Sequence, residues 1–128
     1  LNLNIPYDLA IINKNFTKVP NFAFMYLKII KLTLMKDEIE FIEENAFDKI
    51  EDFDELVLDG NRITNIDFNA DVRMFTINSN KIKLIKNDTF INFKRLDLRL
   101  QLNYNKITHI EQNAFRGLSK LVDFSLNG

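Results

Sequence analysis

An eleven-residue stretch that recurs along the chain constrains the fold more than any other feature of this sequence. Its clearest copy reads Leu-Val-Leu-Asp-Gly-Asn-Arg-Ile-Thr-Asn-Ile over residues 56–66, and further copies occupy residues 75–85 and 100–110. Each copy has two apolar residues at alternate positions, then an asparagine, then two apolar residues three positions apart. Such recurrence predicts one structural coil that is built several times, rather than a single unrepeated core.

The asparagine of this stretch provides a register column for the whole chain. Equivalent positions follow at spacings of 23, 24, 19 and 25 residues and are occupied by Lys14, Asp37, Asn61, Asn80 and Asn105. Apolar residues at alternate positions, as found before each column position, are typical of a strand with one buried face. The pairs are Leu9/Ile11, Leu32/Leu34, Leu56/Leu58, Phe75/Ile77, Leu100/Leu102 and Phe124/Leu126. We expect these strands to pair in parallel, because one coil cannot bury its own apolar residues and must stack on its neighbours.

Two further features describe the inside of each coil. An inward-pointing amide carries donors and acceptors, so the register column is expected to satisfy backbone groups at a sharp bend. An ionised Asp37 can only accept hydrogen bonds, so its site needs donors or a proton. Four coils carry a phenylalanine followed by apolar residues at +3 and +6, which predicts a turn of helix, a 3₁₀ turn or a loop on the back of the coil. These residues are Phe24, Phe47, Phe90 and Phe115.

Two coils depart from the regular length. The coil from Asn61 to Asn80 has 19 residues instead of 24, and residues 67–71 replace its phenylalanine element, which predicts a tight loop without a helix. The coil from Asn80 to Asn105 has one residue more than the 24-residue coil. We expect a bulge or a slipped register near residues 95–99 to accommodate it.

The repeat, together with the Asn-Ala-Phe segments at 45–47 and 113–115, resembles the leucine-rich repeat of the typical subclass found in extracellular proteins. The resemblance covers about residues 9–128. It implies an α/β solenoid with a curved parallel sheet on the concave face and short helices, 3₁₀ turns or loops on the convex face. Residues 11–24 and 62–75 look most like leucine-rich repeat proteins of insect haemolymph immunity and Toll-type ectodomains.

We expect residues 1–128 to form a single array of about five to six coils. The next register position falls one residue past Gly128, and the cysteine-rich caps usual in extracellular members are absent, which indicates an N-terminal portion of a longer protein. Residues 1–6 lack the features of a signal peptide, and no apolar run is long enough for a membrane span.

The outward positions of the strands are candidate contacts for a protein partner, since solenoids bind along such surfaces. These candidates are Met35, Val57, Asp59, Arg62, Thr76, Asn78, Gln101, Asn103 and Tyr104. Tyr104, Met35 and Gln101 are the expected anchors, because exposed aromatic residues and methionine are enriched at interface cores. Ordinary solvated strand positions explain the same residues equally simply.

Charge is unevenly distributed along the chain. Residues 37–59 hold eleven acidic residues and one basic residue, whereas residues 81–106 hold seven basic and two acidic residues. Opposite patches of this kind steer a charged partner or favour contact with another leucine-rich repeat chain. Solvation of the coil backs is the simpler explanation.

Asn15 and Asn87 stand in N-glycosylation sequons, and use of either would place the protein in the secretory pathway.

Several classes of function find no support in the sequence. A net charge of −1 argues against a nucleic-acid binder, and the absence of cysteine excludes disulfides and thiolate chemistry. His109 is the only histidine, and the three glycines are isolated, so neither a metal site nor a phosphate-binding loop is indicated. We expect no enzymatic activity and no cofactor.

Protein–protein recognition outside the cell is the function most consistent with these features. The family resemblance implies innate immune recognition, through binding of a microbial pattern or a complement-like factor, by a secreted protein or by the ectodomain of a membrane protein. A cell-adhesion or matrix module that only spaces other domains is an alternative. A cytosolic regulatory repeat protein is another, because the chain has no cysteine.

Overall fold

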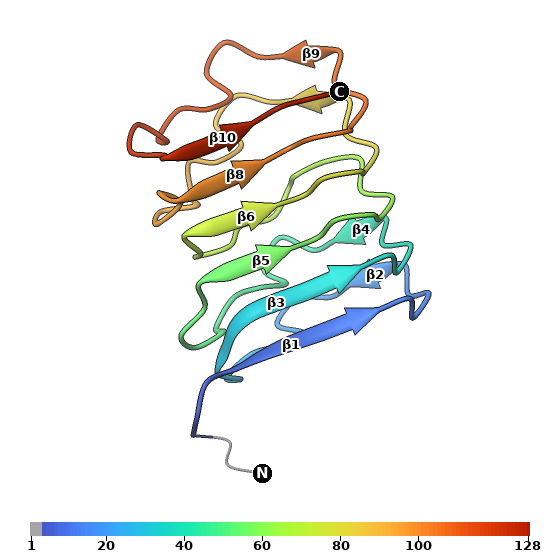
Figure 1. Cartoon of the computed structure of the whole chain (residues 1–128), viewed down its shortest axis with the longest axis vertical. Coiled ribbons are helices and arrows are strands. Elements are labelled where there is room, and N and C mark those ends of the chain that lie inside the picture. Colours follow the sequence, from blue (N-terminus) through green and yellow to red (C-terminus); the bar gives the residue numbers. More distant parts are fainter. Residues whose placement is uncertain (1–3) are drawn as a thin grey trace.

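The computed structural model describes residues 4–128, which form a solenoid built on a six-stranded sheet (Figure 1). Every strand pairs in parallel with the strand of the next coil, so the order of the strands follows the chain. The strands are β1 (Tyr7–Ile12), β3 (Ile29–Met35), β5 (Glu55–Val57), β6 (Met74–Thr76), β8 (Arg99–Gln101) and β10 (Asp123–Ser125). Each strand contains the first member of a predicted apolar pair, which confirms the predicted solenoid. Residues 1–3, the first half of the segment that lacks signal-peptide features, lie outside the described residues.

The back of the solenoid carries two small parallel sheets, separated by the short coil (Figure 1). β2 (Lys18–Val19) pairs with β4 (Phe41–Ile42), and β7 (Leu84–Ile85) pairs with β9 (His109–Ile110). The equivalent residues of the short coil, 65–66, form no strand. This gap divides the back of the solenoid in two.

Turns and loops make up the rest of the back, and residues 4–128 contain no helix. Of the alternatives expected there, residues 4–128 show loops and single turns closed by a hydrogen bond to the carbonyl three residues earlier, such as that from Phe93 to Phe90, and no helix. Positive φ angles at Phe22, Tyr26 and Lys49 interrupt the turns, because an L-residue in the left-handed region cannot continue a right-handed helix. No helix of residues 4–128 meets the length and apolarity that a membrane span requires.

An irregularity lies within the expected range of residues 95–99, because the backbone N–H groups of Leu98 and Arg99 both donate to the carbonyl of Arg73, at 3.0 and 3.3 Å. Arg99, Leu100 and Gln101 pair without a shift with both β6 and β10. A register shift is also present between β1 and β3, where Tyr7 faces Ile29 and Asp8 faces Lys31. Residues 99–101 of β8 pair continuously with the strands on both sides. The extra residue of the long coil therefore lies outside this paired segment.

Contacting phenylalanine rings run through the core of the solenoid from the first coil to the last, among buried leucine, isoleucine and valine side chains. Phe24 stacks on Phe47, and Phe90 stacks on Phe115, with ring centroids 6.5 and 5.9 Å apart. Phe68, in the short coil, closes the gap between these pairs, since its ring lies 5.6 Å from that of Phe47 and contacts the rings of Phe75 and Phe93. The short coil thus keeps an aromatic core residue although it lacks the Ala-Phe segment.

The predicted ladder of inward amides is present at Asn61, Asn80 and Asn105, all of which are buried. The Nδ2 atom of each donates to the carbonyl three residues earlier and to a carbonyl of the preceding coil. The Oδ1 atom of each accepts a backbone N–H of the preceding coil. Each amide therefore joins its own coil to the one before it.

Asp37 occupies the same column and is 0% exposed. Its Oδ1 accepts the backbone N–H of Lys14 at 2.7 Å, whereas its Oδ2 is buried without a hydrogen-bond partner. The carboxyl group thus reproduces the acceptor half of the asparagine pattern and lacks the donor half. Lys14, the first column residue, is exposed.

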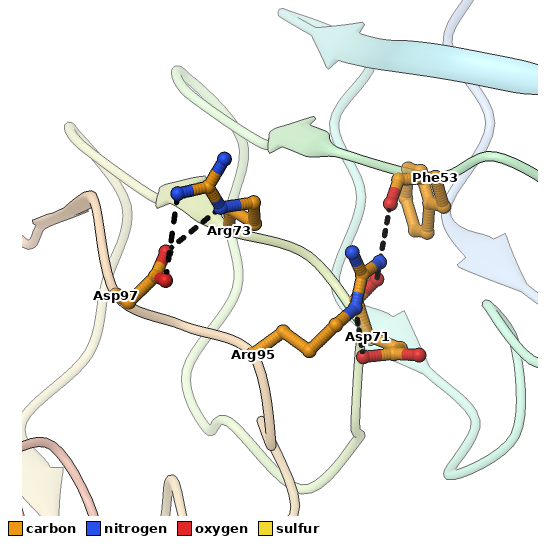
Figure 2. A network of polar contacts seen from close by, with 5 residues as sticks. All are labelled: Phe53, Asp71, Arg73, Arg95 and Asp97. Atoms are coloured by element: carbon orange, nitrogen blue, oxygen red, sulfur yellow. Dashed lines mark hydrogen bonds and ion pairs between the residues drawn. The ribbon is translucent and has the colours of Figure 1, made fainter.

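The Arg95 side chain bridges the space left by the shortened coil (Figure 2). Its Nη2 donates to the carbonyl oxygens of Phe53 and Asp71 at 2.7 and 2.8 Å, and its Nε donates to Asp71 Oδ1 at 2.8 Å. These three residues belong to three successive coils. Beside them, Arg73 donates to Asp97 at 3.0 Å, and this hydrogen bond raises the pKa of Arg73 above its ordinary value.

Candidate functional site

The outward side of the six-stranded sheet (the strand face) presents four rows of side chains. In-register pairing places equivalent residues of neighbouring strands side by side, so each row crosses the sheet. The rows stand six, four, two and one residues before the register column. Alternation along a strand puts the first three rows on the side opposite the buried apolar pairs.

The first row is absent from the contacts predicted from the sequence. It consists of Asp8, Lys31, Glu55, Met74, Arg99 and Asp123. Two ion pairs lie in it, one joining Lys31 to Glu55 at 3.6 Å and one joining Arg99 to Asp123 at 3.1 Å. Met74 lies between the two pairs and is partly exposed. Extending the strand alternation to the residue just before each apolar pair would have identified this row.

The second row contains three of the predicted contact residues, two of which are nearly buried. Val57 is 8% and Thr76 is 6% exposed, so these central side chains offer a partner little surface. Gln101, an expected anchor, is partly exposed, and its Oε1 accepts a hydrogen bond from Asn78 Nδ2 at 3.0 Å. The middle of this row therefore serves the packing of the sheet.

The third row contains a second ladder, formed by Asp59, Asn78 and Asn103. Oδ1 of Asp59 accepts the backbone N–H of Asn78 at 2.9 Å, and Oδ1 of Asn78 accepts that of Asn103 at 2.8 Å. Oδ1 of Asn103 accepts both the backbone N–H of Asn127 and the hydroxyl of Ser125 at 2.8 Å. These three predicted contact residues thus use their oxygen atoms to hold the next coil.

Met35 and Arg62 lie in earlier coils than Tyr104. Met35 is partly exposed in the third row, and three strand spacings between β3 and β8 separate it from the coil of Tyr104 by roughly 14 Å. Arg62 follows the register column, outside the four rows, and forms an ion pair with Glu38 at 3.5 Å. The structure therefore does not bring Met35, Arg62 and Tyr104 together into one compact site.

The fourth row has positive φ at every position. Its members are Asn13, Lys36, Gly60, Ser79, Tyr104 and Gly128. Glycine adopts this conformation without strain, whereas an L-side chain costs roughly 1–2 kcal/mol. Tyr104 combines a φ of 59° with 67% exposure. A Cβ atom at Gly128 would lie 2.9 Å from Tyr104 Cδ1, so the glycine leaves the space that the ring occupies.

Both sequon asparagines are exposed. Asn87 Oδ1 accepts the backbone N–H of Asn113 at 2.9 Å, whereas its Nδ2, the atom that carries an N-linked glycan, donates to no group of the described chain. Asn15 follows the first column position with a φ of 56°. The structure therefore leaves both attachment positions on the surface.

Groups suited to catalysis or metal binding are not gathered in the described part of the chain. His109 belongs to β9 and lines a cavity of about 390 Å³ with apolar neighbours such as Leu102 and Leu126. No group of three or more histidine, aspartate or glutamate side chains among residues 4–128 has a geometry that could hold a metal ion.

Comparison with known proteins gives one consistent result. A family model described as leucine rich repeat matches residues 70–128, and a model described as BspA type leucine rich repeat region (6 copies) matches residues 7–96. Lumican of Gallus gallus and lumican of Coturnix japonica are each 36% identical to this chain over 100 residues. That alignment covers 70% of this chain and 27% of each lumican, so the chain spans about a quarter of the length of these relatives.

Proposed function

This chain belongs to the leucine-rich repeat family, whose stacked repeats serve as scaffolds for protein–protein interaction, and we propose that its strand face captures a protein partner outside the cell. The chain aligns with 27% of its relatives' length, so the proposal concerns this array of coils. The array binds its partner without catalysing a reaction on it.

Tyr104 is the observation that carries this proposal. Its ring is 67% exposed on a backbone position with positive φ, where Gly60 and Gly128 show that glycine fits. The tyrosine therefore costs roughly 1–2 kcal/mol of backbone strain that glycine would avoid. An aromatic ring at the centre of an interface offsets such a cost, because tyrosine is among the residues that contribute most to binding.

The first row supplies a second apolar contact, toward the opposite end of the strands from Tyr104. Met74 lies between the Lys31–Glu55 and Arg99–Asp123 ion pairs, so an apolar contact is flanked by charge on both sides. Interfaces commonly have an apolar centre inside a polar rim. We place the partner over Met74, Gln101 and Tyr104, on β6 and the coil of β8.

An extracellular location for this interaction is supported by two features. Residues 45–47 and 113–115 carry the Asn-Ala-Phe segments of the typical extracellular subclass, and Asn87 presents its Nδ2 atom at the surface of a sequon. The likeness of residues 11–24 and 62–75 to innate-immunity proteins supports a microbial pattern or a complement-like factor as the partner.

Exchanging Tyr104 for glycine tests the strand face without damaging the fold. Tyr104→Gly removes the ring and relieves the positive-φ strain, so the variant should unfold at the same or a higher temperature while binding weakens tenfold or more. The partner is first captured from extracellular fluid, identified by mass spectrometry and then titrated by calorimetry. Ser79→Gly, at an exposed position of the same row with a φ of 56°, is the matched control and should bind normally.

Equal binding by wild type, Tyr104→Gly and Ser79→Gly would contradict the proposed anchor. The location is tested separately by expression through a secretory pathway. The intact mass should then exceed the chain mass by a glycan that Asn87→Gln removes, and an unmodified mass would count against use of this sequon.

A module that only spaces other domains is the second candidate, and the outer ladder favours it. Asp59, Asn78 and Asn103 use their oxygens within the chain, as expected of a face built for rigidity. Under this function no saturable partner of the strand face exists, and Met74→Asp would leave every interaction of the protein unchanged.

A further inference from the structure

A pocket of about 510 Å³ opens on the flank where the last two complete coils return to the sheet, away from the strand-face anchor Tyr104. Four cationic side chains line it, from Arg73, Lys94, Arg95 and Lys120. Asp97 is the only carboxylate in its wall, and Ser119 adds a hydroxyl group. A hollow lined mainly by one sign of charge concentrates the electrostatic field and attracts ions of the opposite sign.

The two arginines are held in place before any ligand arrives (Figure 2). Arg73 is fixed by Asp97, and Arg95 by Asp71 and the carbonyl of Phe53. Both guanidinium groups make these contacts through Nε and Nη2, so the Nη1 donors of both have no partner within residues 4–128. Oriented and unused N–H groups suit an acceptor that has several oxygen atoms.

The two lysines have no comparable role in the fold. Neither Lys94 nor Lys120 has a carboxylate within ion-pair distance in the part of the chain that the structure describes, and both are exposed. Counting four cations against the carboxylates of Asp71 and Asp97, and against Asp54, whose charge also acts on Arg73, leaves a net charge of +1 around the pocket. The structural ion pairs are complete without the lysines, so this excess charge is unused in the folded chain.

From this arrangement we infer that the flank pocket binds a tetrahedral oxyanion, the phosphate or sulfate group of an ester. Arg73 and Arg95 donate Nη1 hydrogens to its oxygens, Lys94 and Lys120 neutralise its charge, and Ser119 donates its hydroxyl. A phosphate monoester carries a charge of about −1.5 to −2 at pH 7, opposite in sign to the excess charge of the pocket. This function goes beyond protein capture by the strand face, because the pocket leaves Tyr104 uncovered.

Titration with small esters at constant ionic strength tests this inference. Methyl phosphate and methyl sulfate are added to ¹⁵N-labelled protein, with chloride adjusted so that general screening does not change. Saturable shifts are expected at the amides of Ser119 and Lys120 and at the Nε–H groups of Arg73 and Arg95. Stronger binding of one ester identifies that group as the ligand.

A double variant provides the decisive comparison. Lys94→Gln with Lys120→Gln removes two charges that have no partner in the fold, so thermal unfolding should be unchanged while the dissociation constant rises roughly tenfold. Lys81→Gln with Lys106→Gln is the matched control, since both lysines are exposed in the same two coils and neither lines the pocket. An equal loss in both double variants, or shifts that never saturate for either ester, would overturn the oxyanion site.

Discussion

The Nδ2 atom of Asn61 donates a hydrogen bond to the carbonyl oxygen of Leu34, one coil earlier in the chain, at 2.7 Å. The same amide donates to Leu58 at 3.0 Å, and its Oδ1 accepts the backbone N–H groups of Asp37 and Ile39. One buried side chain thus satisfies four backbone groups at a bend. An ionised carboxylate cannot replace it, because it has acceptors and no donor.

Asn61→Asp should therefore destabilise the chain, whereas Asp37→Asn should stabilise it. The first change leaves the carbonyls of Leu34 and Leu58 without their donor, at a cost of about 1–3 kcal/mol. The second supplies a donor at the Oδ2 position of Asp37, which has no partner, and should add about 1 kcal/mol. Urea unfolding followed by circular dichroism measures both free energies of unfolding. Asn65→Asp is an exposed control, and a loss of stability in Asp37→Asn would refute the argument.

Phe68→Ala should be among the most destabilising single changes in the chain. The ring is buried and joins the aromatic contacts of Phe47 to those of Phe75 and Phe93, so its removal opens a cavity where the two halves of the core meet. Removing a buried phenylalanine ring costs about 3–5 kcal/mol. Phe41→Ala, at a position that is 66% exposed, is the control for thermal unfolding. A similar loss from the two changes would show that Phe68 does not link the two halves of the core.

Arg95→Ala should cost about 1–3 kcal/mol, because the carbonyl of the buried residue Phe53 loses its donor. Arg95→Lys should recover only part of this free energy, since an ammonium group cannot span Asp71 and Phe53 as a planar guanidinium does. Arg116→Ala breaks an exposed ion pair with Asp88 and should cost less than about 1 kcal/mol. Chemical unfolding of the three variants ranks these effects, and equal losses from Arg95→Ala and Arg116→Ala would contradict the bridging role.

Acidification should weaken the junction of the first two coils. A hydrogen bond from Lys18, with a second from the backbone N–H of Asn21, lowers the pKa of Glu43 below its ordinary value of 4.5. Because the unfolded chain binds this proton more readily, the contribution of Glu43 is complete above pH 4.5 and is lost as pH falls through its folded pKa. Unfolding of Glu43→Gln, measured at pH 6 and in steps below about pH 4.5, should lose less stability on acidification than wild type does. Identical pH profiles for the two proteins would rule the effect out.

Much of the fold follows from residue patterns that report burial directly. The apolar pairs place all six strands, and the column of Asn61, Asn80 and Asn105 locates the bends, because inward positions must be apolar or fully hydrogen-bonded. Periodicity could not distinguish the turns of the back from short helices. The positive φ values at Phe22 and Tyr26, which decide that question, occur at residues with no intrinsic preference for them.

The candidate site was harder to predict, because outward polar residues look alike in a sequence. Asn78 and Asn103 read as solvated contact positions, yet their oxygens hold the next coil. Val57 and Thr76 read as surface residues and are nearly buried by their neighbours across the sheet. The position of Met74 between two ion pairs depends on which residues of adjacent strands pair. This pairing is hard to assign from sequence spacing alone, because the coils differ in length.

The sequence by itself determined that this chain forms a stack of coils, because a repeated apolar period can be buried only by stacking on a neighbouring copy. The tertiary structure decided how the irregular coils fit that stack. Phe68 fills the core of the short coil, Arg95 reaches across it, and the turn before each column residue places Tyr104 on the surface. These outcomes depend on contacts between residues about one or two coils apart, whose partners are set by three-dimensional register and not by local preference.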